Sequence, residues 1–404
     1  MIIQIGNGNL GRAARTADGI SALIVSGIAV AGKFALGDVL GPLRSVKDAE
    51  ALGIDAAYDS DNKLLAHHHI SDFYDKGAND GNELYVMVVA DTVTMADVCD
   101  KTNDYAKLLL ETLQGKVKLL GITRVPDGTY AAAATNQFDP DVWSAITNAK
   151  ALIAEEAEAH RPVQVLIEGR DFQGTASSAK DLRASDGPDA NRVSVVCSAD
   201  NDVSIAETEY AAYAHVGYVL GRLAAIPVQR NIGRVKDGPM SILEPGLSNG
   251  AKLSTFTLTE IEALHDLGYI LMRSYDNRPG YYFTDDPTAC PVDDDYASIH
   301  RGRPIDKATR LARTVFEGEL LDDVEVDPDT GKLEVAVVKG YQQKTEKYIE
   351  VNMLNYGEIS GVRCVVDPDQ DILSTDQVEI NLAIVPKGMT REFLVKLNYE
   401  NPSS

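Results

Sequence analysis

The chain has 404 residues, of which 61 are Asp or Glu and 38 are Lys or Arg, so its formal net charge is -23. This length predicts two or three domains, and this charge excludes nucleic acid and anionic membranes as expected partners. The four cysteines form no C-x-x-C pair. The chain shows no signal peptide and no run of about 20 apolar residues, so we expect a protein made and kept in a reducing cytosol.

Residues 1–19 combine glycine with Asn and Asp and show little helical periodicity, which predicts an extended N-terminal arm. Within it, Gly6, Gly8 and Gly11 match the G-x-G-x-x-G of a dinucleotide site. However, the predicted strand Ile20–Val25 follows too soon for an intervening helix and ends without the required acidic residue. We therefore expect glycines that let the arm bend, and no bound cofactor.

The middle of the chain alternates strand-like and helix-like segments, which predicts βαβ units and a parallel sheet. The alternating segments are Leu84–Val89, Met95–Leu113, Val117–Val125, Pro140–His160, Val163–Glu168, Val193–Cys197, Glu207–Ala224 and Thr257–His265. Asp139 and Pro140 predict the start of one helix, and Thr257 with Glu260 predicts a capping box at another. We place the α/β domain over residues 20–250.

Residues 251–404 combine predicted hairpins with helices, which predicts an α+β domain that ends in a β-hairpin. Its expected elements are strands within Ile270–Phe283, a helix from Pro304, a hairpin over Val324–Val337 that turns at Asp327–Gly331, a helix over Tyr341–Leu354, and a final hairpin that pairs Val378–Ile384 with Phe393–Tyr399. No internal repeat or heptad run is present, so any fibre must arise from the packing of subunits.

Gly246 to Gly250 spell G-x-S-x-G, the pattern of a hydrolase nucleophile elbow, with Asp266 and His300 following in the usual order. An elbow needs a core strand before the serine and a helix directly after it. Here Pro245 precedes the motif and an irregular or strand-like segment follows it, so we expect no catalytic role for Ser248.

His67, His68 and His69 are adjacent, so on a regular backbone their side chains point apart and cannot chelate one metal ion together. We expect a partly exposed surface or interface segment, whose role the sequence leaves open. Asp293–Asp295 lack the glycine and distal glutamate of a calcium loop, and Asp327–Gly331 is a hairpin turn. No metal site is predicted.

The string from Tyr281 to Lys307, YYFTDDPTACPVDDDYASIHRGRPIDK, resembles the C-terminal domain of contractile phage tail sheath proteins. The predicted elements from Pro304 to Tyr399 follow that family's order, and GRLAAIPVQRNIGRVKDG, which starts at Gly221, is similar to sheath-like proteins of Bacteroides-type phages or prophages. The first half resembles the family only loosely. The resemblance implies a central α/β domain, a sheath-type C-terminal α+β domain and extended terminal arms.

The same resemblance implies a structural subunit of a virion tail or injection system, assembled in the bacterial cytoplasm and without enzymatic activity. Family members form hexameric rings stacked around an inner tail tube protein, meet baseplate and tail terminator proteins, and exchange strands between subunits. Such strand addition needs a free sheet edge and depends little on sequence. The candidates for these interfaces are Met1, Ile2, Ile3, Ile5, Val378, Ile380, Leu382 and Ile384.

Four basic residues are further interface candidates, because they could meet acidic neighbours in a lattice or on the tube. These are Arg12, Arg15, Arg234 and Lys236, with solvated surface charge as the alternative for each. Two readings therefore stay open: a polymerising sheath subunit, and a cytosolic α/β enzyme that binds NAD through Gly6, Gly8 and Gly11 or hydrolyses substrates with Ser248.

Overall fold

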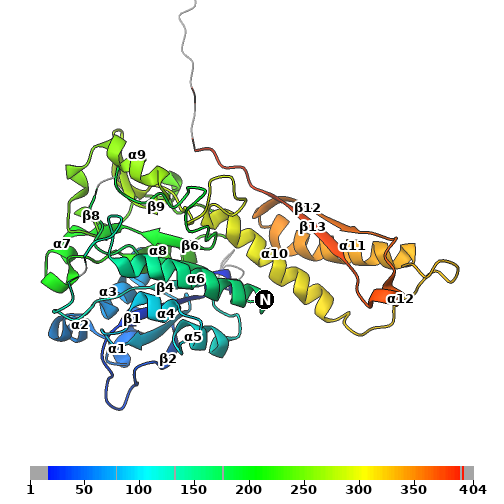
Figure 1. Ribbon diagram of the computed structural model, residues 1–404, viewed down its shortest axis with the longest axis horizontal. Helices are drawn as coiled ribbons and strands as arrows, with labels where there is room; N and C mark the ends of the chain where they lie inside the picture. The colour runs from blue at the N-terminus through cyan, green and yellow to red at the C-terminus, as the bar shows by residue number, and fades with distance from the viewer. Residues whose placement is uncertain (1–16, 79, 132, 175–176, 392–393, 395–404) are drawn as a thin grey trace, which may run out of the picture. The chain divides into compact units, whose positions relative to one another are not determined.

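The computed structural model describes residues 17–78, 80–131, 133–174, 177–391 and 394, and the chain divides into two compact units, Met1–Arg313 and Thr314–Ser404 (Figure 1). The expected N-terminal arm lies outside the described residues except for η1 (Ala17–Gly19), a short 3-10 turn.

The first unit is built on a seven-stranded sheet in the order β2-β3-β1-β4-β5-β6-β9. All neighbouring strands are parallel except β2, which runs antiparallel to β3 at one edge. The strands are β1 (Ser21–Ser26), β2 (Val39–Leu43), β3 (Leu84–Val89), β4 (Leu119–Ile122), β5 (Gln164–Glu168), β6 (Val193–Val196) and β9 (Tyr269–Ile270). The predicted parallel sheet is thereby confirmed.

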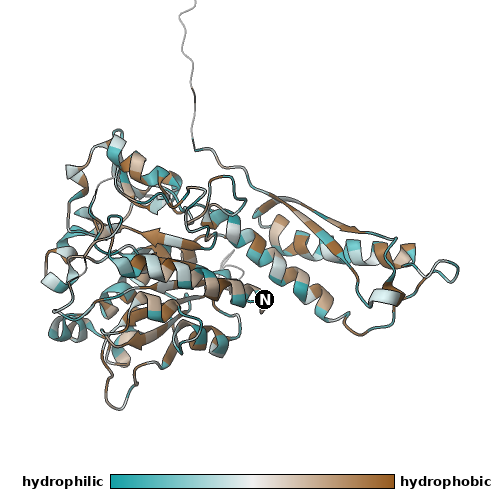
Figure 2. Ribbon diagram, viewed as in Figure 1, coloured by the Kyte–Doolittle hydropathy of each residue, from teal (hydrophilic) through white to brown (hydrophobic). Residues whose placement is uncertain are grey.

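Helices cover both faces of this sheet, so its strands are hydrophobic on both sides (Figure 2). In β1, Leu23 and Val25 belong to one core and Ala22 and Ile24 to the other. The first core packs against α1 (Val46–Ala51), α2 (Ala56–Asn62), α3 (Ala66–Ser71), the π-helical turn η2 (Asp72–Ala78) and α8 (Val216–Ala225), and the second against α4 (Met95–Cys99), α5 (Ala106–Leu113) and α6 (Pro140–Glu158).

Smaller elements extend the first unit beyond the sheet. They are β7 (Ser198–Asp200) paired with β8 (Pro245–Leu247), β10 (Met272–Tyr275) paired with β11 (Arg278–Phe283), helices α7 (Asn201–Ser204), α9 (Leu258–Asp266) and α10 (Ile299–Glu317), and the turns η3 (Thr208–Tyr210), η4 (Val235–Asp237) and η5 (Leu253–Thr255). None of the helices in the described part of the chain has the length and apolarity that a bilayer crossing needs.

The boundary that we placed near residue 250 falls inside the first unit, which extends to Arg313. The physical reason is that β9 returns to the main sheet and pairs with β6, through Val195 with Tyr269 and Val196 with Ile270. Two residues of strand are too short a signal to identify from the sequence, and they join the segment after residue 250 to the α/β core.

The second unit is an α+β structure around a small core of its own. It contains the end of α10, α11 (Val335–Ile349), η6 (Glu350–Leu354), α12 (Ile372–Thr375) and the antiparallel pair β12 (Ile359–Val366) and β13 (Ile380–Pro386). Leu333, Val338, Cys364 and Val366 are buried together, and Val378, Ile380 and Leu382 pack against them. Of the hydrophobic alternation predicted over residues 378–384, Val378, Ile380 and Leu382 therefore face this core.

Several expected elements differ from the structure: the helix expected from Pro304 begins at Ile299, and the stretch Met95–Leu113 divides into α4 and α5. The helix expected over Glu207–Ala224 begins only at Val216, after η3. The turn at Asp327–Gly331 is present, but Val326 and Leu333 form only a single bridge, and α11 starts at Val335 where a strand was expected. Strand β13 pairs with β12; the residues expected to pair with it, 393 and 395–399, lie outside the described residues.

Candidate functional site

The carboxyl ends of β1, β4 and β5 are the natural place for a ligand site in this sheet. Strand order reverses at β1, which has β3 on one side and β4 on the other, and parallel sheets bind ligands at such a reversal. Here the segments at the ends of β1 and β4 are bonded to each other, because the Val125 amide donates to the Ser26 hydroxyl at 3.1 Å. The residues that continue from β4 and β5 then form a buried polar network and a cavity.

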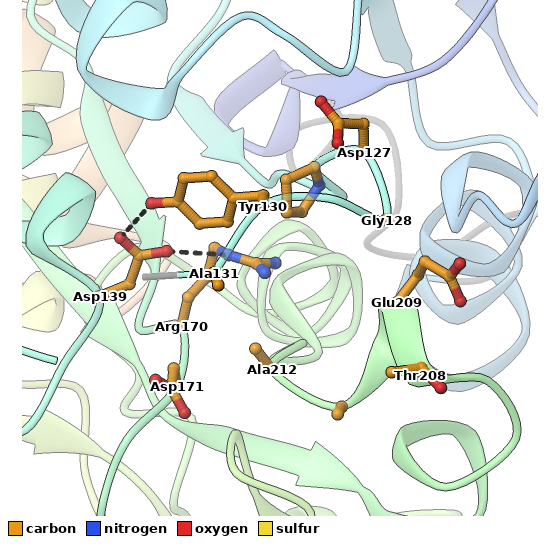
Figure 3. Close-up of a pocket in the computed structure, with 12 residues that line it drawn as sticks. Asp127, Gly128, Tyr130, Ala131, Asp139, Arg170, Asp171, Thr208, Glu209 and Ala212 are labelled. Carbon is orange, nitrogen blue, oxygen red and sulfur yellow. Dashed lines mark hydrogen bonds and ion pairs between the residues drawn. The ribbon is translucent and has the colours of Figure 1, made fainter. Parts of the chain in front are cut away.

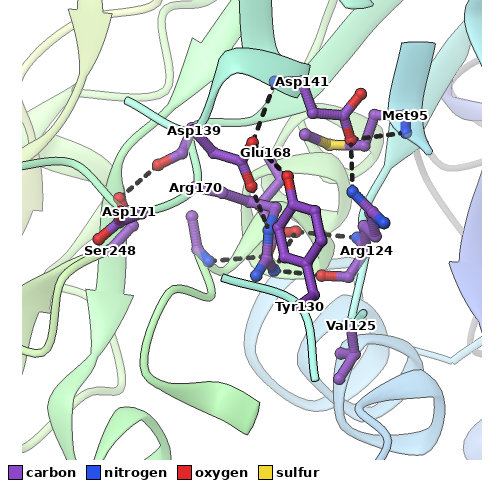
Figure 4. A network of polar contacts seen from close by, with 12 residues as sticks. Met95, Arg124, Val125, Tyr130, Asp139, Asp141, Glu168, Arg170, Asp171 and Ser248 are labelled. Atoms are coloured by element: carbon purple, nitrogen blue, oxygen red, sulfur yellow. Dashed lines mark hydrogen bonds and ion pairs between the residues drawn. The ribbon is translucent and has the colours of Figure 1, made fainter. Parts of the chain in front are cut away.

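The network is centred on two arginines that follow strands β4 and β5 (Figure 4). Arg124 Nη1 lies 3.2 Å from Asp141 Oδ2, and Arg170 Nε lies 3.7 Å from Asp139 Oδ2. Glu168 accepts hydrogen bonds from the Arg124 amide at 2.9 Å and lies 3.5 Å from Arg170 Nη1. Burial raises the pKa of Glu168, and the positive charge of Arg170 opposes that shift.

The acidic members of the network hold the backbone in place. Asp139 caps α6 by accepting from the Asp141 amide at 3.0 Å. Asp141 in turn accepts from the amides of Met95 and Ala96 at the start of α4, both at 2.9 Å. The second oxygen of Glu168 accepts from the Ala214 amide at 2.9 Å, just before α8. These carboxylates therefore join three helices to the end of the sheet, which is a structural use of buried charge.

Beside the network lies a cavity of about 280 Å³ (Figure 3). Its lining comprises Pro126, Asp127, Gly128, Tyr130, Ala131, Asp139, Arg170, Asp171, Thr208, Glu209, Ala211 and Ala212. Among these described residues there is no Ser, Cys or His, and the Tyr130 hydroxyl donates to Asp139 at 2.8 Å.

The other charges at the cavity are also engaged locally. Glu209 forms an ion pair with Lys63 at 2.7 Å, and Asp127 accepts from the Thr129 amide at 2.7 Å within its own turn. Burial, together with the negative charge of Asp139, raises the pKa of Asp171. Among the described residues, the cavity therefore brings no Ser, Cys or His nucleophile together with a base.

Ser248 is fully buried directly after β8. Its hydroxyl donates to the Gly169 carbonyl and its amide to the Cys197 carbonyl at 2.9 Å. His300, the residue that would serve as its base, uses Nδ1 with Asp286 Oδ1 at 2.6 Å. The structure therefore does not build a hydrolase elbow at Ser248. The glycines of the dinucleotide-like motif lie outside the described residues.

The three adjacent histidines lie on α3, where Asp59 accepts from the amides of His67 and His68 at 3.1 and 2.8 Å. The expectation of a partly exposed segment is wrong for His69, which is 1% exposed. Burial lowers the pKa of His69 to about 3, and the pKa of His215 on the facing segment falls to about 3 for the same reason. Both imidazoles are neutral parts of the core.

Asp285, Asp286 and His300 are the described residues whose arrangement comes nearest to a metal site, with one ligand atom from each within 4.8 Å of the others. The Asn231 amide group fills the space between them: its nitrogen lies 2.8 Å from Asp286 Oδ1 and 3.3 Å from His300 Nδ1. The Asn231 oxygen accepts from the Gly233 amide at 2.7 Å, which fixes this orientation. The cluster is thus an internally bonded polar group at the start of α10.

The interface candidates divide into three sets. Met1, Ile2, Ile3, Ile5, Arg12 and Arg15 lie outside the described residues. Arg234 pairs with Asp237 at 2.6 Å, and Lys236 is exposed beside it in η4. Val378, Ile380 and Leu382 contribute their side chains to the core of the second unit, and Ile384 is partly exposed on β13.

The buried network escaped prediction because its members are far apart in the sequence. The sequence did contain a signal, since Arg124 follows the apolar β4, Glu168 ends β5 and Arg170 follows it. Polar residues at the ends of neighbouring parallel strands meet at one edge of the sheet. The sequence did identify Asp139 as a helix cap, but gave no indication of its partner Arg170.

Two family models match the chain: the DUF2586 N-terminal domain over residues 2–287 and the DUF2586 C-terminal domain over residues 295–404. No curated protein matches it. Among solved structures, it is similar to a chain of the anti-feeding prophage (AFP) baseplate, 6-fold symmetrised, with a TM-score of 0.62, 14% identity and coverage of 95% of this chain and 94% of that chain.

Two further solved structures, both sheaths in the contracted state, are similar over almost the full chain. The AFP helical sheath gives a TM-score of 0.60 and 14% identity, covering 99% of each chain. The PVC sheath complex of an extracellular contractile injection system gives 0.59 and 10% identity, covering 100% of this chain and 98% of that chain. The expected resemblance is confirmed at the level of the fold.

Proposed function

Since the chain belongs to the DUF2586 family and has the fold of contractile sheath proteins, we propose that it is a structural subunit of a contractile tail sheath. Its copies polymerise as stacked rings or a helix around an inner tube and contract by rotation of rigid subunits. The observation that carries this proposal is the likeness to the contracted AFP sheath over 99% of both chains. The chemistry of the described cavity agrees, because its polar groups brace helices.

The β12–β13 pair supports a self-assembling role. It forms a two-stranded sheet among the described residues, so each strand has one edge without a strand partner there. Ile380 and Leu382 face the unit's own core, whereas Val385 is 55% exposed. The apolar side chains thus hold the strand in place while the backbone edge stays available for a strand from a neighbouring subunit.

The partners follow from the same proposal. They are further copies of the chain, in six-fold rings as in the symmetrised AFP baseplate structure, together with an inner tube protein, a baseplate and a tail terminator. We place the assembled protein in a phage tail or injection-system sheath, built in the bacterial cytoplasm. The subunit does its work through interfaces between rigid bodies and performs no catalysis.

The decisive experiment is negative-stain electron microscopy of the purified chain over a range of concentration and salt. Wild-type protein should form tubes or stacked rings. A truncation that lacks residues 1–16 and the variant Val385→Lys should both lose them, because the first removes the proposed arm and the second adds a charge at the strand edge. Val292→Lys, at a valine that is 64% exposed in the first unit, is the matched control.

If Val385→Lys and Val292→Lys assemble alike, strand addition at β13 is wrong. Wild-type protein that stays monodisperse should be mixed with its inner tube protein, which can act as a template. Failure to assemble on the tube as well would refute the sheath proposal itself.

A further inference from the structure

The start of β1 is held by an ion-pair cluster that the sheath role does not by itself explain. Asp18 lies in η1, three residues before β1, an interior strand of the sheet. Its carboxylate is bound by Lys307 Nζ at 2.6 Å and by Arg310 Nη2 at 2.9 Å. Arg303 Nη2 donates to the Asp18 carbonyl oxygen at 3.2 Å.

These three cations occupy one face of α10, because their spacing of four and then three residues follows the helical repeat. The cluster is largely withdrawn from solvent, with side-chain exposures of 14% for Asp18, 10% for Lys307 and 21% for Arg310. Ion pairs in such partly buried positions are screened less by salt than pairs on an open surface.

Helix α10 is itself fixed to the sheet, so it provides a rigid support. Asp306 accepts from Arg192 Nη2 at 2.8 Å and from Gln164 Nε2 at 2.7 Å. Gln164 opens β5, and Arg192 immediately precedes β6. An added Cβ on Gly302 would lie 2.9 Å from Gln164 Nε2, which shows how closely the helix lies over the strands.

Gly19, the residue after Asp18 in η1, is closely packed against α8. A Cβ added to Gly19 would lie 2.4 Å from the carbonyl oxygen of Ala224, near the end of α8. The Lys118 amide donates to the Ile20 carbonyl at 2.9 Å. Burial, followed by the charge of Arg310, lowers the pKa of Lys118 to about 8, and the charge of Asp18 opposes this shift. The Asp18 carboxylate therefore acts on Lys118 as well as on Lys307 and Arg310 of α10.

We propose that Asp18 is a positioning residue that fixes residues 17–20, between the proposed N-terminal arm and β1, by binding to Lys307 and Arg310 of α10. The inference rests on the proposed function, in which that arm reaches a neighbouring subunit. With the clamp in place, a pull on the arm acts on α10 as well as on β1. Without it, the pull acts on β1 and on the contacts of Gly19 and Ile20 with their neighbours.

The clamp is tested on the full-length chain by hydrogen exchange with mass spectrometry, comparing wild type with Asp18→Asn. Losing charge-assisted bonds should speed exchange at residues 17–21 about tenfold, with little change in melting temperature. Arg310→Gln should have the same local effect, which keeps the test valid if one variant folds poorly. Glu83→Gln, which removes an ion pair with Arg44 near the same end of β1, is the control and should leave residues 17–21 unchanged.

Unchanged exchange at residues 17–21 in both clamp variants would overturn the clamp. The positioning role is tested separately, by the fraction of protein that sediments as assembled sheath. Asp18→Asn should lower this fraction relative to Glu83→Gln, and equal fractions would overturn the positioning role. If wild type does not assemble even with its tube, the sheath proposal fails, whereas the exchange result still decides the clamp.

Discussion

The two neutral histidines of the first core should make the protein sensitive to acid. His69 is 1% exposed and His215 is fully buried, and burial lowers the pKa of each to about 3 from an ordinary 6.5. A depressed histidine pKa means that the unfolded chain binds protons before the folded chain does. This contribution to stability is therefore complete above pH 6.5 and is lost as the pH falls toward 3.

The magnitude follows from the linkage between protonation and unfolding. Each pH unit below the unfolded-state pKa costs about 1.4 kcal/mol per histidine, so each should cost about 2 kcal/mol at about pH 5. Other groups oppose this trend, since burial raises the pKa of Asp59 to about 7 and of Asp286 to about 6. Those carboxyls favour the folded state as the pH falls, so the effect of the histidines must be isolated with variants.

His69→Met and His215→Met remove one titrating group each while roughly conserving volume. Free energies of unfolding from urea titrations at about pH 7.5 and about pH 5 should show each variant gaining about 2 kcal/mol on wild type as the pH falls. His160→Asn, at an exposed histidine in a left-handed conformation, should show no such gain. A difference between variant and wild type that is the same at both pH values would refute the reasoning.

Two further predictions concern packing and buried charge. In Gly221→Ala the new methyl group would lie 2.4 Å from the Phe73 carbonyl oxygen, so α8 and η2 must move apart. We expect this variant to lose about 2 kcal/mol of unfolding free energy in urea titrations. The control is Gly340→Ala in α11, whose methyl group meets nothing within 4 Å and should stabilise the protein by about 0.5–1 kcal/mol. Arg124→Met leaves the Asp141 carboxylate buried without its cation and should cost about 3–5 kcal/mol in urea unfolding. A loss below about 1 kcal/mol would mean that the network is not structural.

Local signals in the sequence were sufficient for the elements that local energetics decide. Strand β3 coincides with the predicted Leu84–Val89, because its continuous apolar run suits a strand buried on both faces. The capping box of Thr257 and Glu260 and the cap at Asp139 are present as expected, because each satisfies backbone donors within a few residues. Resemblance also identified the family fold before any geometry was known.

Longer-range packing overrode local preference elsewhere. Val335, Val337 and Val338 suit a strand, yet they begin α11, because Val338 joins the core of the second unit from a helix. Likewise, β9 has only two residues, and its pairing with β6 helps to extend the first unit past residue 250. Such choices depend on partners that no short window of sequence contains.

The sequence by itself determined the class of the fold and the helix caps at Asp139 and Thr257. Only the tertiary structure decided that His69 is buried, that Ser248 donates to a backbone carbonyl, and that Asp18 meets Lys307 and Arg310. The physical reason is that burial and ion pairing depend on the distance between atoms in space. Asp18 and α10 are nearly 300 residues apart in the chain, and the sheet brings them together.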